Sequence, residues 1–193
     1  MARIDPLPRK SWPTQMREAL KAMVPPEPRY PLSQEGRPSG TNIFGAIAHH
    51  PTLARAYFGL NGHLLLATTL TERHRELIIM RAAALARSTY EWVQHVFLSR
   101  DAGLSDLEIA WIAWGPDAPF WNESDAAVLR SVDELVVNGV IGDDTWTVLS
   151  AQLTTEQILD LIFTAGSYGM LAWMVASLGV ELDDDLRAAL DGP

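Results

Sequence analysis

The chain has 193 residues, 48% of them hydrophobic and 20% charged, which is the balance of a folded globular protein of single-domain size. Its 15 basic and 24 acidic side chains give a net charge of −9, which argues against a nucleic-acid partner because phosphate binding relies on clustered cations. The lack of any cysteine excludes disulfides, thiolate nucleophiles and thiol peroxidase chemistry on the chain's own sulfur.

Residues 1–41 are predicted to form an N-terminal arm. Met1 to Lys10 lacks the apolar block of a signal peptide, so we expect a cytoplasmic protein. A short helix is expected around Thr14 to Met23. Val24 to Thr41 then contains five prolines and two glycines, which favour irregular structure on the surface. We interpret this loop either as a lid or as an arm that wraps around the domain or a neighbouring subunit.

Residues 42–193 read as helix in every periodic segment, so we predict a single all-α domain, a helical bundle. The helix ends are predicted from N-cap residues, capping boxes and glycines. The expected helices are Asn42 to His50, one beginning at His50-Pro51, Thr71 to Arg87, Thr89 to Ala102 before Gly103, one begun by the capping box Ser105-x-x-Glu108, Asn122 to Val137 before Asn138-Gly139, and one begun by Thr154-x-x-Gln157.

Leu161 to Val180 is a stretch of twenty residues without a charge, which is long enough to span a bilayer. Its flanks are acidic and carry no Lys or Arg to anchor at lipid headgroups, so we interpret it as a buried helix and expect no membrane contact. A helix that is apolar on most faces must hide more surface than one contact stripe covers. We therefore expect it to pack partly against another subunit, with Gly166 and Gly169 permitting close approach.

Candidate chemistry is concentrated in two consecutive predicted helices. Ser88, Glu91 and His95 lie at positions i, i+3 and i+7, so they share one helix face, and Glu91 and His95 are expected to touch. If the preceding helix brings Glu76 opposite this face, the group contains an acid, a base and an orienting carboxylate. That set is sufficient for proton transfer at carbon.

Each of these residues also has a structural interpretation. A single His–Glu pair on an apolar helix can be a hydrogen-bonded core feature. Glu76 can be a buried carboxylate paired with Arg81 or Arg87, and Ser88 can be the N-cap of its helix. Two carboxylates and one imidazole make a thin ligand set, so we expect no metal and no cofactor.

Five short motifs between Asn42 and Trp114 carry a family resemblance. They are Asn42-Ile43-Phe44, His50-Pro51-x-Leu53, Arg73-x-x-Glu76-Leu77, Tyr90-Glu91-Trp92-x-x-His95 and Ala102-Gly103-Leu104-Ser105. In these motifs the chain resembles the carboxymuconolactone decarboxylase family, which also contains the alkylhydroperoxidase D proteins. The resemblance implies the helical bundle of the alkylhydroperoxidase D type and a homo-oligomer, a trimer or a hexamer.

The alkylhydroperoxidase branch of that family has a glutamate twelve residues before a Cys-x-x-Cys, whose second cysteine lies four residues before a histidine. Glu76, Ser88, Glu91 and His95 reproduce this spacing, with Ser88 and Glu91 at the two cysteine positions. The peroxidase reaction of that branch needs a thiolate and a resolving thiol, so we do not expect it here.

The decarboxylase branch needs no thiol. Resemblance to it implies a cofactor-independent acid–base enzyme, decarboxylase-like or lyase-like, acting on a small organic acid or lactone. His95 is then the expected proton donor, Glu91 its orienting partner and Glu76 a second carboxylate. The residues expected to bind the substrate are Arg73, Arg81 and Ser88. The alternatives are a non-catalytic oligomeric binding protein of the same fold, and an accessory antioxidant role that uses thiols from a partner.

Overall fold

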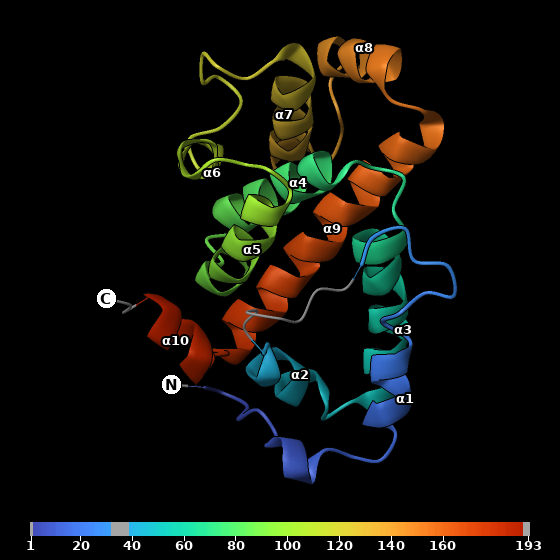
Figure 1. Cartoon of the computed structure of the whole chain (residues 1–193), viewed down its shortest axis with the longest axis vertical. Helices are drawn as coiled ribbons and strands as arrows, with labels where there is room; N and C mark the ends of the chain where they lie inside the picture. Colours follow the sequence, from blue (N-terminus) through green and yellow to red (C-terminus); the bar gives the residue numbers. More distant parts are fainter. Residues whose placement is uncertain (1, 32–38, 191–193) are drawn as a thin grey trace. The chain divides into compact units, whose positions relative to one another are not determined.

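A computed structural model describes residues 2–31 and 39–190, and within those ranges the regular structure is entirely helical (Figure 1). The all-α prediction is confirmed for this part of the chain. The helices fall into two compact units, residues 1–68 with 174–193 and residues 69–173. The division predicted between residues 41 and 42 lies inside the first of these units and stays a prediction.

The first unit is organised around helix α3 (Pro51–Gly62), which continues as a π-helical turn, His63–Ala67, and packs against helices α1 (Met16–Lys21) and α2 (Thr41–Ile47). The predicted start of α3 is confirmed, because the His50 side chain accepts a hydrogen bond from the Leu53 backbone and Pro51 occupies the first turn. A single helical turn, Arg9–Ser11, precedes α1, and helix α10 (Asp184–Leu190) closes the unit near the C-terminus.

The predicted lid or arm belongs to this unit and is described only in part. Its residues 24–31 form no helix, and the Arg29 backbone N–H donates to the Leu66 carbonyl at 2.6 Å. Residues 32–38 lie outside the described residues. The two interpretations of this segment therefore stay predictions.

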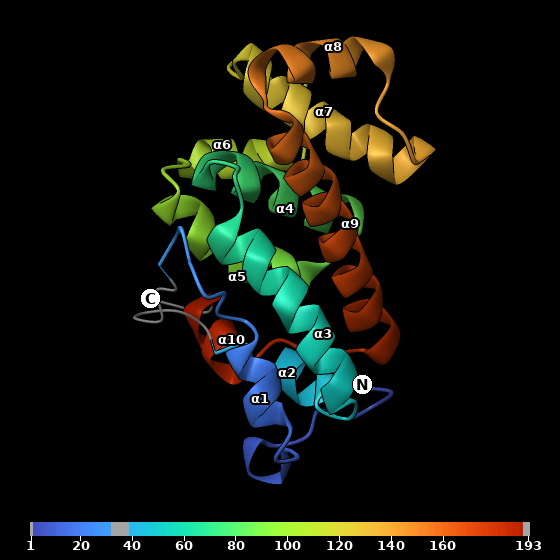
Figure 2. The ribbon, with the colours of Figure 1, turned by 90° about the vertical axis from the view of Figure 1, so that its right-hand side faces the viewer.

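The second unit contains helices α4 (Glu72–Leu85), α5 (Thr89–Asp101), α6 (Asp106–Ile112), α7 (Glu123–Asn138) and α8 (Asp143–Gln152), with the part of α9 (Thr155–Leu178) up to residue 173. Helix α4 packs against α5, α6 and α7, and α7 in turn packs against α8 (Figure 2). All nine residues from 75 to 83 are buried, so α4 is enclosed on every face. This central helix carries Glu76.

The helix boundaries follow the predicted cap chemistry. Ser105 and Glu108 form a reciprocal capping box at the start of α6, and Thr154 and Gln157 exchange the same pair of bonds before α9. Gly103 has φ +84°, the left-handed conformation expected of a residue that ends a helix. Helix α8 is the element that the sequence patterns do not predict, since Gly142 at its N-cap position offers no side chain for capping.

Helix α9 is the one helix among the described residues that is long and apolar enough to cross a membrane, by length and composition alone. Of its most apolar window, 56% is buried within the protein. One face of α9 therefore packs inside the protein while the other stays exposed. Its predicted lack of membrane contact stays a prediction.

Candidate functional site

Helices α4 and α5 present the predicted site residues to one another inside the second unit. Thr71 caps α4 by accepting a hydrogen bond from the His74 backbone, and a short connection after Leu85 leads into α5. Glu76 on α4 is 0% exposed, and Glu91 and His95 on α5 are 2% and 7% exposed. Burial of three ionisable side chains is costly unless partners or altered protonation compensate it.

Glu76 is a partnered carboxylate. Its Oε2 lies 2.8 Å from His95 Nδ1, and its Oε1 accepts a hydrogen bond of 2.8 Å from Arg75 Nε. Burial acts to raise the pKa of Glu76, but the charges and hydrogen bonds of His95 and Arg75 lower it below the ordinary value. Because an ionised carboxylate only accepts hydrogen bonds, Nδ1 of His95 must carry a hydrogen. In the neutral ring, Nε2 is then the free base.

The predicted arginine partners of Glu76 are wrong, because Arg75 takes that role. Arg81 lies five positions further along α4, which rotates it by about 140° around the helix and away from Glu76. Arg75 is buried beside Glu76, and its Nη2 also lies 3.7 Å from the Glu72 carboxylate.

Glu91 has the opposite environment to Glu76. Within the described ranges, neither of its buried carboxyl oxygens has a hydrogen-bond partner. Burial raises the pKa of Glu91 to about 8, and the nearby Ser88 hydroxyl only partly opposes this shift. Glu91 is therefore a neutral carboxylic acid at pH 7, with a proton to donate.

The expected direct contact between Glu91 and His95 is not formed. The two side chains share a face of α5, four residues apart, but the Nδ1 atom of His95 is held by Glu76. Glu76 orients the imidazole, and Glu91 lies on the same face with no hydrogen-bond partner in the part of the chain that the structure describes. Glu76, and not Glu91 as the sequence predicted, is the carboxylate that contacts the imidazole.

Ser88 occupies the N-cap position of α5 without capping it. Its side chain makes no cap hydrogen bond, and its buried hydroxyl has no partner among residues 2–31 and 39–190. Its backbone N–H instead donates to the Ala83 carbonyl at 2.9 Å. The predicted N-cap position of Ser88 is therefore confirmed, but its side chain does not form the cap hydrogen bond.

Tyr168 of α9 is a neighbour of the site that the sequence patterns missed. Its ring meets that of His95 edge to face, with centroids 5.1 Å apart and an interplanar angle of 87°. Tyr168 is itself buried. The two residues are separated by most of the second unit along the chain, and no spacing rule connects them. The one available signal is a tyrosine inside a long uncharged stretch.

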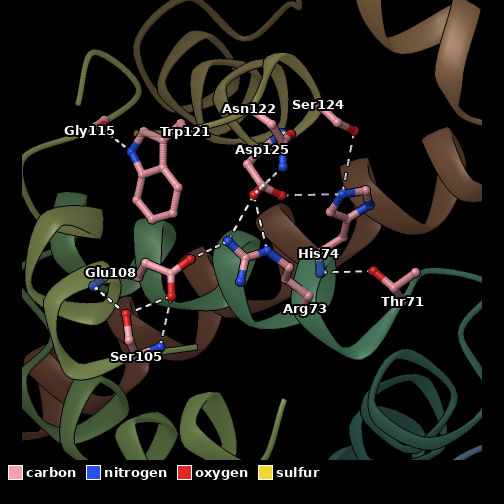
Figure 3. A network of polar contacts seen from close by, with 10 residues as sticks. All are labelled: Thr71, Arg73, His74, Ser105, Glu108, Gly115, Trp121, Asn122, Ser124 and Asp125. Atoms are coloured by element: carbon pink, nitrogen blue, oxygen red, sulfur yellow. Dashed lines mark hydrogen bonds and ion pairs between the residues drawn. The ribbon is translucent and has the colours of Figure 1, made fainter. Parts of the chain in front are cut away.

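Arg73 forms a separate polar network at the start of α4 (Figure 3). Its Nε and Nη2 donate to Asp125 Oδ2 at 3.0 and 2.9 Å, and Nη2 also donates to Glu108. Burial acts to raise the pKa of Asp125, but hydrogen bonds from His74 and Arg73 lower it. This network ties α4 to α6 and α7.

Arg81 is also bound within the protein. It donates to the Asp133 carboxylate and, through Nη1, to the carbonyls of Ile112 and Ala113 at 3.0 and 2.8 Å. Gly115, with φ +117°, leaves room for it, since a Cβ there would lie 3.0 Å from Arg81 Nη2. Substrate binding by Arg73 and Arg81 stays a prediction, and their guanidinium groups already serve structural ion pairs.

The described ranges contain no group of three or more His, Asp or Glu side chains placed to hold a metal ion. Glu76, Glu91 and His95 are arranged as one hydrogen-bonded pair and one separate acid. The geometry of these three side chains favours proton transfer over metal coordination.

Comparison with protein-family models identifies a match over part of the chain. Residues 51–133 match the model of the carboxymuconolactone decarboxylase family. This range contains α4, α5 and α6, and with them Glu76, Ser88, Glu91 and His95. Comparison with curated proteins gives no match.

Solved structures of the same fold cover most of the chain. The alkylhydroperoxidase AhpD core of an uncharacterised peroxidase-related protein from Ralstonia eutropha JMP134 aligns with a TM-score of 0.68 at 20% identity, over 86% of this chain and 97% of that one. The debrominase Bmp8 in its apo form aligns with a TM-score of 0.70 at 18% identity, over 98% of this chain and 96% of that one. The C82A variant of Bmp8 in complex with 2,3,4-tribromopyrrole gives the same TM-score at 17% identity. These structural similarities show that the chain shares the fold of these proteins.

Proposed function

We propose that this chain, whose residues 51–133 match the model of the carboxymuconolactone decarboxylase family, is a cofactor-independent acid–base enzyme that decarboxylates a small organic acid or lactone. One observation carries this proposal. A buried, neutral Glu91 without a hydrogen-bond partner among the described residues shares a helix face with a His95 that Glu76 holds in one tautomer. A structural carboxylate would be expected to have a partner.

The proposed reaction uses only proton transfer. The bond between the substrate carboxylate and its neighbouring carbon breaks, carbon dioxide leaves, and the electron pair moves onto a conjugated carbonyl as an enolate. A proton from the enzyme then adds to carbon, and solvent restores the proton to the enzyme. Substrate and product differ by carbon dioxide, with one proton taken up, so the step needs neither an oxidant nor a reductant.

The protonation states at the site suit an anionic substrate. The charge of Glu76 is offset by Arg75, with which it shares a 2.8 Å hydrogen bond. Because the pKa of Glu91 is raised to about 8, this residue adds no negative charge at pH 7. A carboxylate can therefore enter without facing a second, uncompensated carboxylate, and the low-dielectric surroundings favour its loss as neutral carbon dioxide.

The proposed roles of the two glutamates and of His95 differ from those predicted from the sequence. Glu91 is the proton donor to carbon. His95, with Nδ1 held by Glu76, offers Nε2 as the second proton-carrying atom, and Glu76 orients it. Tyr168 restricts the imidazole from the side of α9. Bmp8 supports a small planar substrate, since its C82A variant holds a small aromatic ring in a similar fold.

Deuterium incorporation tests the proposal. The purified protein is incubated in D₂O with a panel of small carboxylated lactones and conjugated acids, while carbon dioxide release is measured and the product is analysed by NMR. The wild-type protein should release carbon dioxide and place one deuterium on carbon. Glu91→Gln and His95→Gln should each lower kcat by about 100-fold or more, since general acid–base catalysis contributes factors of that order.

Glu156→Gln is the matched control, because Glu156 is an exposed carboxylate in the first turn of α9. It should keep full activity. The wild-type kcat/KM should fall as the pH rises through about 8, where Glu91 loses its proton. Full turnover by both site variants would overturn the assigned roles. Saturable binding of a panel member without carbon dioxide release or deuterium uptake would favour the non-catalytic binding protein.

A further inference from the structure

Two buried hydroxyl groups lie one helical turn from the ring contact between His95 and Tyr168. Ser99 follows His95 by four residues on α5, and Thr164 precedes Tyr168 by four residues on α9. Residues four apart share a helix face, so each hydroxyl is on the side of its helix that carries the ring contact. Both side chains are 0% exposed, and neither hydroxyl has a hydrogen-bond partner within the described residues.

A buried hydroxyl inside a helix has a local remedy that these two residues do not use. A serine or threonine in a helix can donate to the carbonyl three or four residues earlier. The equally buried Ser131 of α7 does so, donating to the Val128 carbonyl at 2.7 Å. Ser99 and Thr164 make no such bond, so both keep a donor for another acceptor. An unpartnered buried hydroxyl costs stability, and a bound ligand that accepts from it would offset that cost.

The charges around the ring contact favour an oxygen that becomes negative during a reaction as this acceptor. The charge of Glu76 is offset by Arg75, and Glu91, whose pKa is raised to about 8, is neutral at pH 7. A hydroxyl that is oriented beforehand in low-dielectric surroundings stabilises a developing negative charge strongly, because no water competes with it. In the proposed reaction, this charge develops on the conjugated carbonyl oxygen as carbon dioxide leaves.

We propose that the hydroxyls of Thr164 and Ser99 bind the carbonyl oxygen of the substrate and stabilise it as the enolate forms. This inference rests on the proposed function and narrows its substrate class. The substrate carries a carbonyl to which the electron pair of the broken bond can move, as in a β-keto acid or the corresponding unsaturated lactone. Each hydroxyl donates a hydrogen bond and keeps its proton, so the proton that adds to carbon still comes from Glu91.

Removing each hydroxyl with little change in side-chain size tests this assignment. Thr164→Val exchanges the hydroxyl for a methyl group, and Ser99→Ala deletes it. The matched controls are Thr145→Val and Ser131→Ala, because these buried hydroxyls donate within the protein at 2.8 and 2.7 Å. Thr164 has no partner to lose, so Thr164→Val should unfold at a denaturant concentration no lower than the wild type does. Thr145→Val should unfold at a lower one.

Binding of 4-nitrophenol at pH 7 gives a readout that needs no turnover. Its phenolate is a planar anion that shares charge between an oxygen and a conjugated system, as an enolate does, and its absorbance distinguishes phenolate from phenol. The wild type should bind the phenolate. Thr164→Val and Ser99→Ala should each weaken this binding by about 10-fold or more, the contribution of a hydrogen bond to a charged group, and shift the bound probe toward neutral phenol.

A second ligand separates loss of the hydrogen bond from a change in the shape of the site. In 4-nitrotoluene a methyl group replaces the phenolate oxygen, while the ring and the nitro group are the same. Its binding should be equal in the wild type and all four variants. Phenolate binding by the two controls should also equal that of the wild type.

Turnover gives the second readout. With any member of the acid and lactone panel that the wild type decarboxylates, Thr164→Val should lower kcat by about 100-fold, the effect of removing one donor to a developing oxyanion. KM should change little, because the interaction strengthens only as the charge develops. The product should still carry one deuterium on carbon, since Glu91 is intact, and the two controls should keep the wild-type kcat.

The outcomes distinguish failure of the hydroxyl assignment from failure of the proposed function. Weaker phenolate binding by the site variants and by neither control supports the assignment. Absent phenolate binding, or binding that is equal in all proteins, would overturn it and leave the two hydroxyls to buried water. Hydroxyl-dependent phenolate binding without decarboxylation of any panel member would retain the oxyanion site and contradict the proposed function. Decarboxylation with a wild-type kcat in both site variants would retain the function and contradict the assignment.

Discussion

Helix α4 carries two partnered polar side chains whose surroundings differ, the partly exposed Arg73 and the fully buried Glu76. At its N-terminal end, Arg73 shares its hydrogen bonds among Asp125, Glu108 and the helices that carry them. One turn further, Glu76 is equally well partnered, but the facing helix α5 presents Glu91 and Ser88 with no partner among the described residues. A satisfied network holds helices together. An unsatisfied acid of raised pKa costs stability, and such a cost is typical of a functional site.

The largest expected effect comes from breaking the satisfied network. Asp125→Ala removes the buried partner of Arg73 and should lower the free energy of unfolding by about 3 kcal/mol, the low end for a buried ion pair, because Arg73 is 31% exposed and keeps Glu108. Chemical denaturation at pH 7 measures this. Asp117→Ala is the control, since Asp117 is 85% exposed beside Arg130. A loss for Asp125→Ala as small as that of the control would show that the network does not support the fold.

The next prediction is a gain in stability, from Glu91→Gln, and its size depends on pH. Because the folded-state pKa of Glu91 is about 8 and the ordinary value is 4.5, the folded protein holds a proton that the unfolded chain has lost between these two values. The stability contribution of Glu91 is therefore fully present below about pH 4.5 and is lost as the pH rises through 8. Glu91→Gln keeps the shape of the side chain and cannot ionise.

Unfolding of Glu91→Gln and wild type at pH 5 and pH 9 measures this effect. The variant should gain about 3 kcal/mol relative to the wild type between these pH values, at about 1.4 kcal/mol for each unit of pKa change and with allowance for local relaxation. A difference that does not vary with pH would show that Glu91 is ionised in the folded protein and partnered.

Glu76→Gln sharpens the contrast between the two glutamates. It should destabilise the protein by about 2 kcal/mol at pH 7, because Arg75 and His95 lose an ionised acceptor. The pKa of Glu76 is lowered on folding, so its stabilisation is present above the ordinary pKa and is lost as the pH falls through the folded-state value. The melting temperatures of Glu76→Gln and the wild type should therefore converge as the pH is lowered from 7 to 3. Melts of variant and wild type that stay parallel would contradict the ion pair.

The smallest effect concerns Ser88. Because its hydroxyl makes no cap bond, Ser88→Ala should change the free energy of unfolding by less than about 0.5 kcal/mol. Ser105→Ala, which removes one half of a formed capping box, should cost about 1 kcal/mol. Equal losses at the two serines would mean that Ser88 caps α5 in solution.

Local rules predicted most of the helices and the shared face of the candidate site residues on α5. Caps, glycines and apolar spacing act within one or two turns, so the predicted starts of α3, α4, α6 and α9 agree with the structure. The same local spacing placed Ser88, Glu91 and His95 on one face of α5. Helix α8 escaped prediction because its first turn has no side-chain cap, and Tyr168 because nothing local connects it to His95.

The sequence by itself determined which residues are candidates for the site, since composition removed every thiol and the helix repeat placed the acid and the imidazole on one face. Only the tertiary structure decided what each residue does. The approach of α4 to α5 gives Glu76 hydrogen bonds from Arg75 and His95 and leaves Glu91 buried without a hydrogen-bond partner among the described residues, and this difference in surroundings lowers one pKa while it raises the other to about 8. Protonation depends on which atoms surround a carboxyl group in three dimensions, and the order of residues along the chain does not state that.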